Sequence, residues 1–269
     1  MIRSTPAIVA QGAVRRLPRT ALILLCLAYI LPGYFGREPW KNADITAFGY
    51  MVELASGGPH DWLAPTIMGI PPEVDALLPY WLGAWAMQLA PGWMAPDFAA
   101  RLPFGLMLVL VLVATWYGIY QLARSPGAQP VAFAFGGEAQ PADYARAMAD
   151  GGLLGLIGCL GLAQLSHETT PALAQLCFTA LTFYGLSALS GSLLLPLAAI
   201  GAGLTGLTLS GAPAVAVLFG LGGAIFGALE RNETGSAHGG QLWRIAGPLA
   251  AAAAAAALAS SLDLWQWRI

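Results

Sequence analysis

Long apolar runs separated by short polar turns are the feature that most constrains how this chain folds. Crossing the hydrocarbon core of a bilayer takes about 20 mostly apolar residues in one helix. Only 10% of the residues are charged, whereas a soluble domain carries roughly 25%. The sequence therefore predicts an all-α integral membrane protein, a single domain over 1–269 with about seven transmembrane helices. They are expected at roughly 18–35, 100–123, 151–166, 171–189, 192–209, 212–229 and 244–262.

The segment 77–96, "LLPYWLGAWAMQLAPGWMAP", competes with these runs as a further span. Prolines interrupt it, and it is rich in Trp and Tyr, which favour the headgroup region of a bilayer. We interpret it as an interfacial helix that lies on the membrane within the first outward loop, residues 36–99.

The arginine distribution predicts the orientation. Cytoplasmic loops carry an excess of Lys and Arg, and the N-terminal segment before the first apolar run holds Arg3, Arg15, Arg16 and Arg19. With a cytoplasmic N-terminus and no span at 77–96, the loop 124–150 also becomes cytoplasmic and contains Arg124 and Arg146. We therefore expect a multi-pass protein of the bacterial inner (cytoplasmic) membrane, with any site in the loop 36–99 on the periplasmic side.

Two features limit the classes of function. The formal net charge of -2 offers no basic face for nucleic acid. Cys26, Cys159 and Cys177 lie inside apolar runs without metal-ligand spacing, so they are expected to be small buried hydrophobes. No cofactor is indicated, and a requirement for a divalent cation is left open.

The segment "YFGREPWKNADITAFGYM" concentrates the scarce charge directly behind the first apolar run. It contains Arg37, Glu38, Lys41 and Asp44. Asn42 or Asp44 is a candidate N-cap for a surface helix that ends at the glycine pair 57–58. Asp44 could be no more than a cap, and long basic side chains such as Arg37 and Lys41 can also serve as headgroup anchors.

The order of motifs through this loop, "REPWKNAD", "HDWLAP", "YWLGAW" and "ARLP", resembles membrane-embedded glycosyltransferases that use polyprenyl-phosphate sugars. These GT-C-type enzymes include the protein O-mannosyltransferases and the lipid A aminoarabinose transferases. The similarity covers about residues 20–220 and extends to "SHETTP" and to "GAGLTGLTLSGAP". It implies transfer of a sugar from a polyprenyl-phosphate donor to a periplasmic acceptor, which would be lipid A, a glycan or a protein.

The resemblance also implies roles for particular residues. Asp44 matches the carboxylate that acts as general base on the acceptor hydroxyl. Arg37, Lys41 and Arg101 are the outward cations expected to bind the phosphate, and His167 and Glu168 of "SHET" are expected to line the same cavity. The expected partners are membrane lipid and the lipid-linked donor.

Three departures from the family pattern bear on activity. The second acidic residue is Ile45, a Lys-Pro-Pro element is replaced by Asp75, Ala76 and Leu77, and a lysine is replaced by Ser210. The family's C-terminal part is also absent, so the chain is expected to be a divergent or truncated enzyme that alone transfers sugar poorly. A C-terminal partner half on another chain is left open. The alternative is a non-catalytic scaffold or lipid-headgroup-binding subunit. A small transporter is disfavoured, because the spans contain almost no charge and no repeat.

Overall fold

The computed structural model describes residues 7–234 and 238–265. In this part of the chain the regular secondary structure is entirely helical. Among the described residues, β-pairing is limited to two isolated bridges, Ala10 with Glu138 and Ile67 with Ile70. The α-helices are α1 Arg19–Ile30, α2 Lys41–Ser56, α3 Leu78–Leu89, α4 Pro96–Ala123, α5 Pro141–Ile157, α6 Leu160–Leu165, α7 Pro171–Ala188, α8 Leu194–Leu209, α9 Pro213–Thr234 and α10 His238–Ser261.

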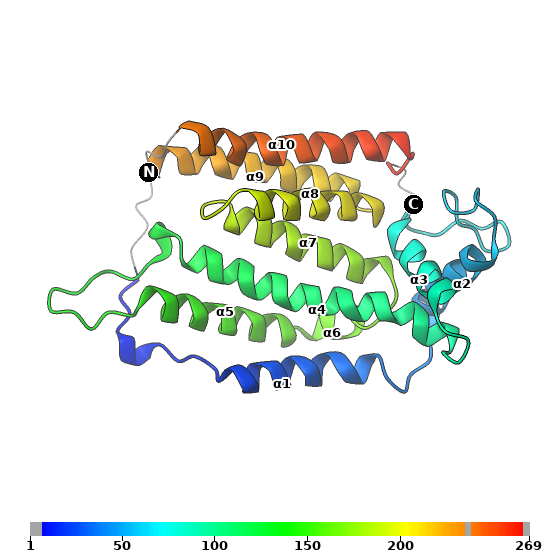
Figure 1. The fold of residues 1–269 in the computed structure, drawn as a ribbon, viewed down its shortest axis with the longest axis horizontal. Helices are drawn as coiled ribbons and strands as arrows, with labels where there is room; N and C mark the ends of the chain where they lie inside the picture. Colours follow the sequence, from blue (N-terminus) through cyan, green and yellow to red (C-terminus); the bar gives the residue numbers. More distant parts are fainter. Residues whose placement is uncertain (1–6, 235–237, 266–269) are drawn as a thin grey trace.

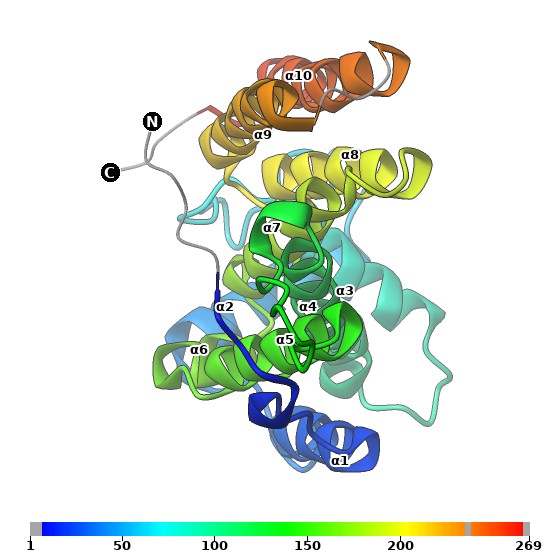
Figure 2. The same ribbon diagram turned by 90° about the vertical axis from the view of Figure 1, so that its left-hand side faces the viewer.

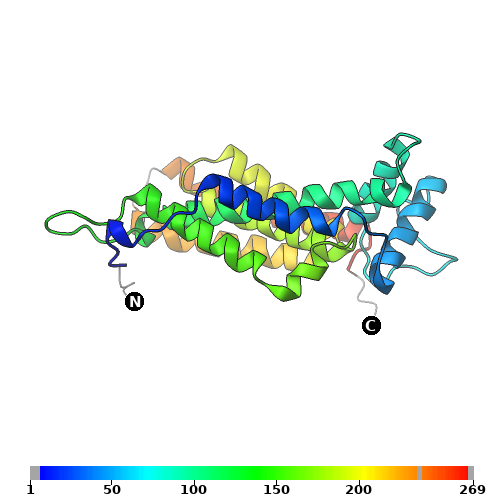
Figure 3. The same ribbon diagram turned by 90° about the horizontal axis from the view of Figure 1, so that it is seen from below.

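Helices α1, α4, α5, α7, α8, α9 and α10 run along the long axis of the molecule, and consecutive ones point in opposite directions (Figure 1). Seen along that axis they form a bundle, with α1 at one edge and α9 and α10 at the other (Figure 2). Helices α2 and α3 lie together beyond one end of the bundle (Figures 1 and 3). We call this the site end, and the other the opposite end.

Most helices begin and end within a few residues of their predicted bounds, but the one predicted at 151–166 does not. Helix α5 begins ten residues earlier, at Pro141, inside the predicted loop 124–150. Proline at the first helical position and Asp143 in the first turn favour that start. The helix then ends at Ile157, and the short α6 follows Cys159.

Two helices of the described residues are long and apolar enough to cross a membrane, Pro96–Ala123 and Leu242–Ser261. This number is smaller than the predicted seven. Arg19–Gly33, Leu194–Leu209 and Pro213–Leu229 are apolar but shorter. A helix rises 1.5 Å per residue, so the 16 residues of α8 extend about 24 Å, less than the roughly 30 Å of a typical hydrocarbon core.

The segment 77–96 forms α3, which has 12 residues and is well short of the length of a span. It packs between α2 and α4 at the site end (Figure 1). The indole Nε1 of Trp81 donates a hydrogen bond of 2.6 Å to the carbonyl oxygen of Trp62. This bond ties the long loop between α2 and α3 to the α3 helix.

The main hydrophobic core lies where α2, α3, α4 and α7 meet, around the fully buried Met51, Phe104, Leu108 and Leu173. Small residues bring the later helices together. A Cβ at Gly203 of α8 would lie 2.2 Å from Oγ1 of Thr182 on α7. The backbones of α7 and α8 can approach this closely only because glycine has no side chain.

Candidate functional site

The candidate site begins at the start of helix α2, and Asp44 lies in the first turn of this helix. The N-cap residue is Trp40, so the prediction of Asn42 or Asp44 at that position is wrong. Asp44 reaches back from within the first turn, where its Oδ2 accepts hydrogen bonds from the Trp40 backbone N–H at 3.0 Å and from Nη2 of Arg37 at 3.1 Å. The carboxylate therefore caps the helix and pairs with a cation at the same time.

The other oxygen of Asp44 binds the turn "SHETTP", which lies between α6 and α7. Oδ1 accepts hydrogen bonds of 2.7 Å from the backbone N–H of Thr169 and of 2.7 Å from its Oγ1. Asp44 is 1% exposed. In total its carboxylate accepts four hydrogen bonds, about as many as a carboxylate has lone-pair sites. Its buried charge is fully satisfied by the protein itself.

His167 fastens the end of α1 to the same turn. Its Nδ1 lies 2.6 Å from the carbonyl oxygen of Ala163, and its Nε2 lies 2.8 Å from that of Tyr29. The ring also fills the space beside Gly33, where an added Cβ would lie 1.8 Å from Cδ2 of His167. The backbone oxygen of His167 accepts a hydrogen bond of 3.3 Å from Nη2 of Arg37. His167, which was predicted to line a cavity, therefore packs and hydrogen-bonds against the ends of α1 and α6.

Tyr34 makes the next connection in this cluster. It is buried, and its hydroxyl donates a hydrogen bond of 3.0 Å to the backbone oxygen of Ser166. Burial raises the pKa of the Tyr34 phenol above its usual value, because the phenolate would lose its hydration. Tyr34 therefore stays neutral and ties the α1–α2 connection to the end of α6.

Lys41 and Glu168 are joined through an amide. Nζ of Lys41 donates to Oε1 of Gln164 at 2.5 Å, and Nε2 of Gln164 donates to Oε1 of Glu168 at 2.6 Å. Glu168 is only 3% exposed. No cationic side chain among the described residues pairs with it directly.

Arg101 lies near Asp44 but is paired with another acid. It is 3% exposed, and its Nη2 lies 3.4 Å from Oδ2 of Asp97, one turn earlier on α4. Its charge also interacts with those of Asp44 and Arg37. Of the three residues predicted to converge, Asp44 and Arg37 are in direct contact, and Arg101 stands beside them.

A cavity of about 560 Å³ adjoins this cluster between α2, the loop before α3, and the start of α7. Of the predicted site residues only Glu168 lines it; Asp44, Arg37, Lys41, Arg101 and His167 do not. Its other polar lining residues are not among the predicted site residues, although Thr170 belongs to the "SHETTP" turn of the family resemblance. They are Asn42, Thr46, Tyr50, Glu73, Tyr80, Thr170 and Gln175.

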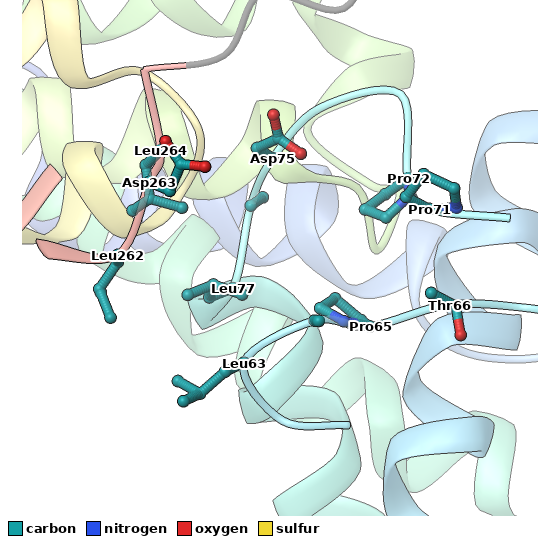
Figure 4. A pocket seen from close by; sticks show the side chains of 12 residues that line it. Leu63, Pro65, Thr66, Pro71, Pro72, Asp75, Leu77, Leu262, Asp263 and Leu264 are labelled. Carbon is teal, nitrogen blue, oxygen red and sulfur yellow. The ribbon is translucent and has the colours of Figure 1, made fainter. Parts of the chain in front are cut away.

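A smaller cavity of about 280 Å³ lies between the loop before α3 and the end of α10. Asp75 comes from that loop and Asp263 from the segment after α10 (Figure 4). Beside it, the Leu77 backbone N–H donates a hydrogen bond of 2.8 Å to the Leu209 oxygen. Asp75 and Ser210, which replace two expected lysines, thus belong to segments that are bound to each other.

No group of three or more His, Cys, Asp or Glu side chains suited to a metal ion occurs in the part of the chain that the structure describes. Comparison of the chain with known protein families, characterised proteins and solved structures finds no match.

Proposed function

We propose that this chain is an integral membrane protein related to the polyprenyl-phosphate-sugar glycosyltransferases, and that it binds the headgroup of a lipid-linked sugar at its site end. The observation that carries the proposal is the cavity of about 560 Å³, lined by hydroxyl, amide and carboxylate groups, at the end of an apolar helical bundle. Convergent polar groups in a largely preformed pocket are typical of small-molecule sites.

The arrangement of the basic residues supports a membrane orientation. Three arginines make contacts at the opposite end. Arg16 pairs with Asp143, Arg146 donates to the Leu17 backbone oxygen, and Arg244 donates to the Ser190 backbone oxygen. An excess of arginine at one end is the pattern of a cytoplasmic surface. In the proposed orientation the site end faces the periplasm, and the seven long-axis helices cross the bilayer, the shorter ones with local thinning of the bilayer.

The cations and the cavity suggest separate roles. Lys41 is exposed at the start of α2. Its Nζ lies 5.7 Å from the ring centroid of Trp40, and Cζ of Arg37 lies 5.9 Å from the same centroid. A donor phosphate would meet positive charge there and not inside the cavity, whose lining in the described residues contains no Lys, Arg or His. The sugar would occupy the cavity.

A second candidate function, headgroup binding without catalysis, is favoured by the state of Asp44. A general base must reach the acceptor proton with a free lone pair, whereas Asp44 already accepts four hydrogen bonds and does not line the cavity. We therefore propose that the chain alone transfers sugar poorly or not at all, as the substitutions at Asp75 and Ser210 also suggest.

The test is to reconstitute the purified chain in lipid and supply a panel of undecaprenyl-phosphate sugars with crude outer-membrane acceptor. Binding of a donor without transfer is the expected result. Robust transfer that is lost in Asp44→Asn would instead establish a complete enzyme with Asp44 as base. Failure to bind any lipid-linked sugar would contradict the proposed function.

A further inference from the structure

The carboxylate of Glu168 is buried without a cation beside it. Its Oε1 accepts one hydrogen bond, from the neutral amide of Gln164, and no donor among the described residues bonds its Oε2. Glutamate is almost never fully buried unless it is paired, because an uncompensated charge loses its hydration. Asp44 in the same cluster has its Arg37, and the contrast marks Glu168 as a group with an unmet electrostatic requirement.

Glu168 lines the cavity of about 560 Å³, so a bound molecule can reach it. Thr170, which is 6% exposed, lines the same cavity, and its Oγ1 is buried with no hydrogen-bond partner. As the N-cap residue of α7, Thr170 makes no side-chain capping bond. A buried hydroxyl without a partner typically costs about 1–3 kcal/mol. Two polar groups from one turn are thus left for something in the cavity to satisfy.

The charge of the cavity selects the kind of molecule. Glu73 supplies a second carboxylate to the lining, and the remaining polar residues, Asn42, Thr46, Tyr50, Tyr80 and Gln175, are neutral. Lys41 is held off from Glu168 by the intervening Gln164. An anionic group would meet like charge here, whereas a cation could form a charge-assisted hydrogen bond with Glu168.

We propose that the cavity binds a headgroup carrying a primary ammonium, which pairs with Glu168 and leaves a neighbouring oxygen of the headgroup to hydrogen-bond with Thr170. The inference rests on the proposed function, because it names the charge of the headgroup that occupies the site. A primary ammonium can come from the phosphoethanolamine of a phospholipid or from an amino sugar, and the cavity recognises the chemistry that both share. The ammonium offers three donors, which can bond the Glu168 carboxylate and neutral oxygens of the cavity lining.

The test measures lipid retention by the full chain, purified in an uncharged detergent, using native mass spectrometry. Short-chain phosphatidylethanolamine should bind at least about tenfold more tightly than phosphatidylglycerol or phosphatidylcholine, since the latter two lack a hydrogen-bonding ammonium. Glu168→Gln should abolish this preference. Glu53→Gln, an exposed carboxylate of α2 that does not line the cavity, should keep it. Thr170→Val should weaken binding several-fold, whereas Thr170→Ser, which keeps the hydroxyl, should bind like the unmodified protein.

Soluble competitors on the unmodified protein keep the test decisive if Glu168→Gln does not fold. Displacement by phosphoethanolamine alone would identify a phospholipid headgroup, and displacement by glucosamine alone an amino sugar; either supports the inference. Equal displacement by glucose or phosphoglycerol, displacement only by Ca²⁺, or an unchanged preference in folded Glu168→Gln would overturn it. If the chain binds neutral sugar-lipids but does not prefer headgroups with an ammonium, this inference alone is overturned. If it prefers the ammonium but binds no sugar-lipid, only the proposed function is contradicted.

Discussion

Asp44 and Thr169 are 125 positions apart in the chain, and Thr169 holds the Asp44 carboxylate with two hydrogen bonds of 2.7 Å. One comes from a backbone N–H and the other from the hydroxyl of the same residue. Together with Arg37 and Trp40, they fix the first turn of α2 against the turn that starts α7. The wall of the cavity formed by Thr170 and Glu168 is therefore positioned by a carboxylate that does not line it.

We expect Asp44→Ala to destabilise the protein strongly. Breaking a buried ion pair typically costs about 3–5 kcal/mol; here the buried Thr169 N–H and hydroxyl and the half-buried Arg37 would all lose their acceptor. Thermal unfolding in detergent, followed by tryptophan fluorescence, measures the effect. Glu53→Gln, which removes an exposed charge from the same helix, is the control. An Asp44→Ala protein as stable as the control would mean that the hydrogen bonds of Asp44 contribute little.

Gly33 and His167 are expected to be coupled. An alanine at Gly33 would place its Cβ 1.8 Å from Cδ2 of His167, so the imidazole must move and give up its contacts with Tyr29 and Ala163. Gly33→Ala should therefore lower the unfolding temperature by several degrees, and the loss should be smaller when His167→Ala is already present. A double-mutant cycle measures this coupling. Gly92→Ala, where no atom lies within 4 Å of the added Cβ, should be nearly neutral, and strictly additive effects would refute the contact.

Tyr34 is expected to make stability fall at alkaline pH. Its folded-state pKa lies above the ordinary value of 10.0 because burial disfavours the phenolate. The unfolded chain therefore releases the proton first as the pH rises. The contribution of Tyr34 is complete below pH 10 and declines above it, by up to about 1.4 kcal/mol per pH unit. Unfolding measured from pH 8 to 11 should show a shallower decline in Tyr34→Phe than in the unmodified protein. Equal slopes would show that Tyr34 does not ionise on unfolding.

The membrane orientation predicts the location of two loops. Reporter fusions after Gly92, which lies between α3 and α4, should report the periplasm, and fusions after Gln129, between α4 and α5, should report the cytoplasm. The reason is that α4, a candidate span of 28 residues, separates them. The two reporters on the same side would eliminate the proposed arrangement of the bundle.

The sequence alone was sufficient for the positions of most long helices. Apolar runs bounded by Pro, Gly and Ser define α4, α7 and α8 within a few residues, because helix length and apolar content are local properties. The start of α5 was missed, because its first turns are polar. Those turns bond the distant N-terminal segment, as when Nη1 of Arg16 donates a hydrogen bond of 2.6 Å to Oδ1 of Asp143.

The tertiary structure decided the roles within the site. From the sequence, Asp44 and Glu168 are both carboxylates near helix starts, and each has a polar neighbour close by in the chain, Arg37 for Asp44 and Gln164 for Glu168. Folding brings Arg37 and Thr169 to Asp44 and leaves Glu168 beside a cavity with only an amide for a partner. Thr169, 125 positions from Asp44, completes the hydrogen bonds of that carboxylate, whereas no such distant donor bonds Glu168 in the described residues. The packed helices therefore decide which charge is satisfied and which can receive a ligand, because contacts between distant segments do not exist until the helices pack.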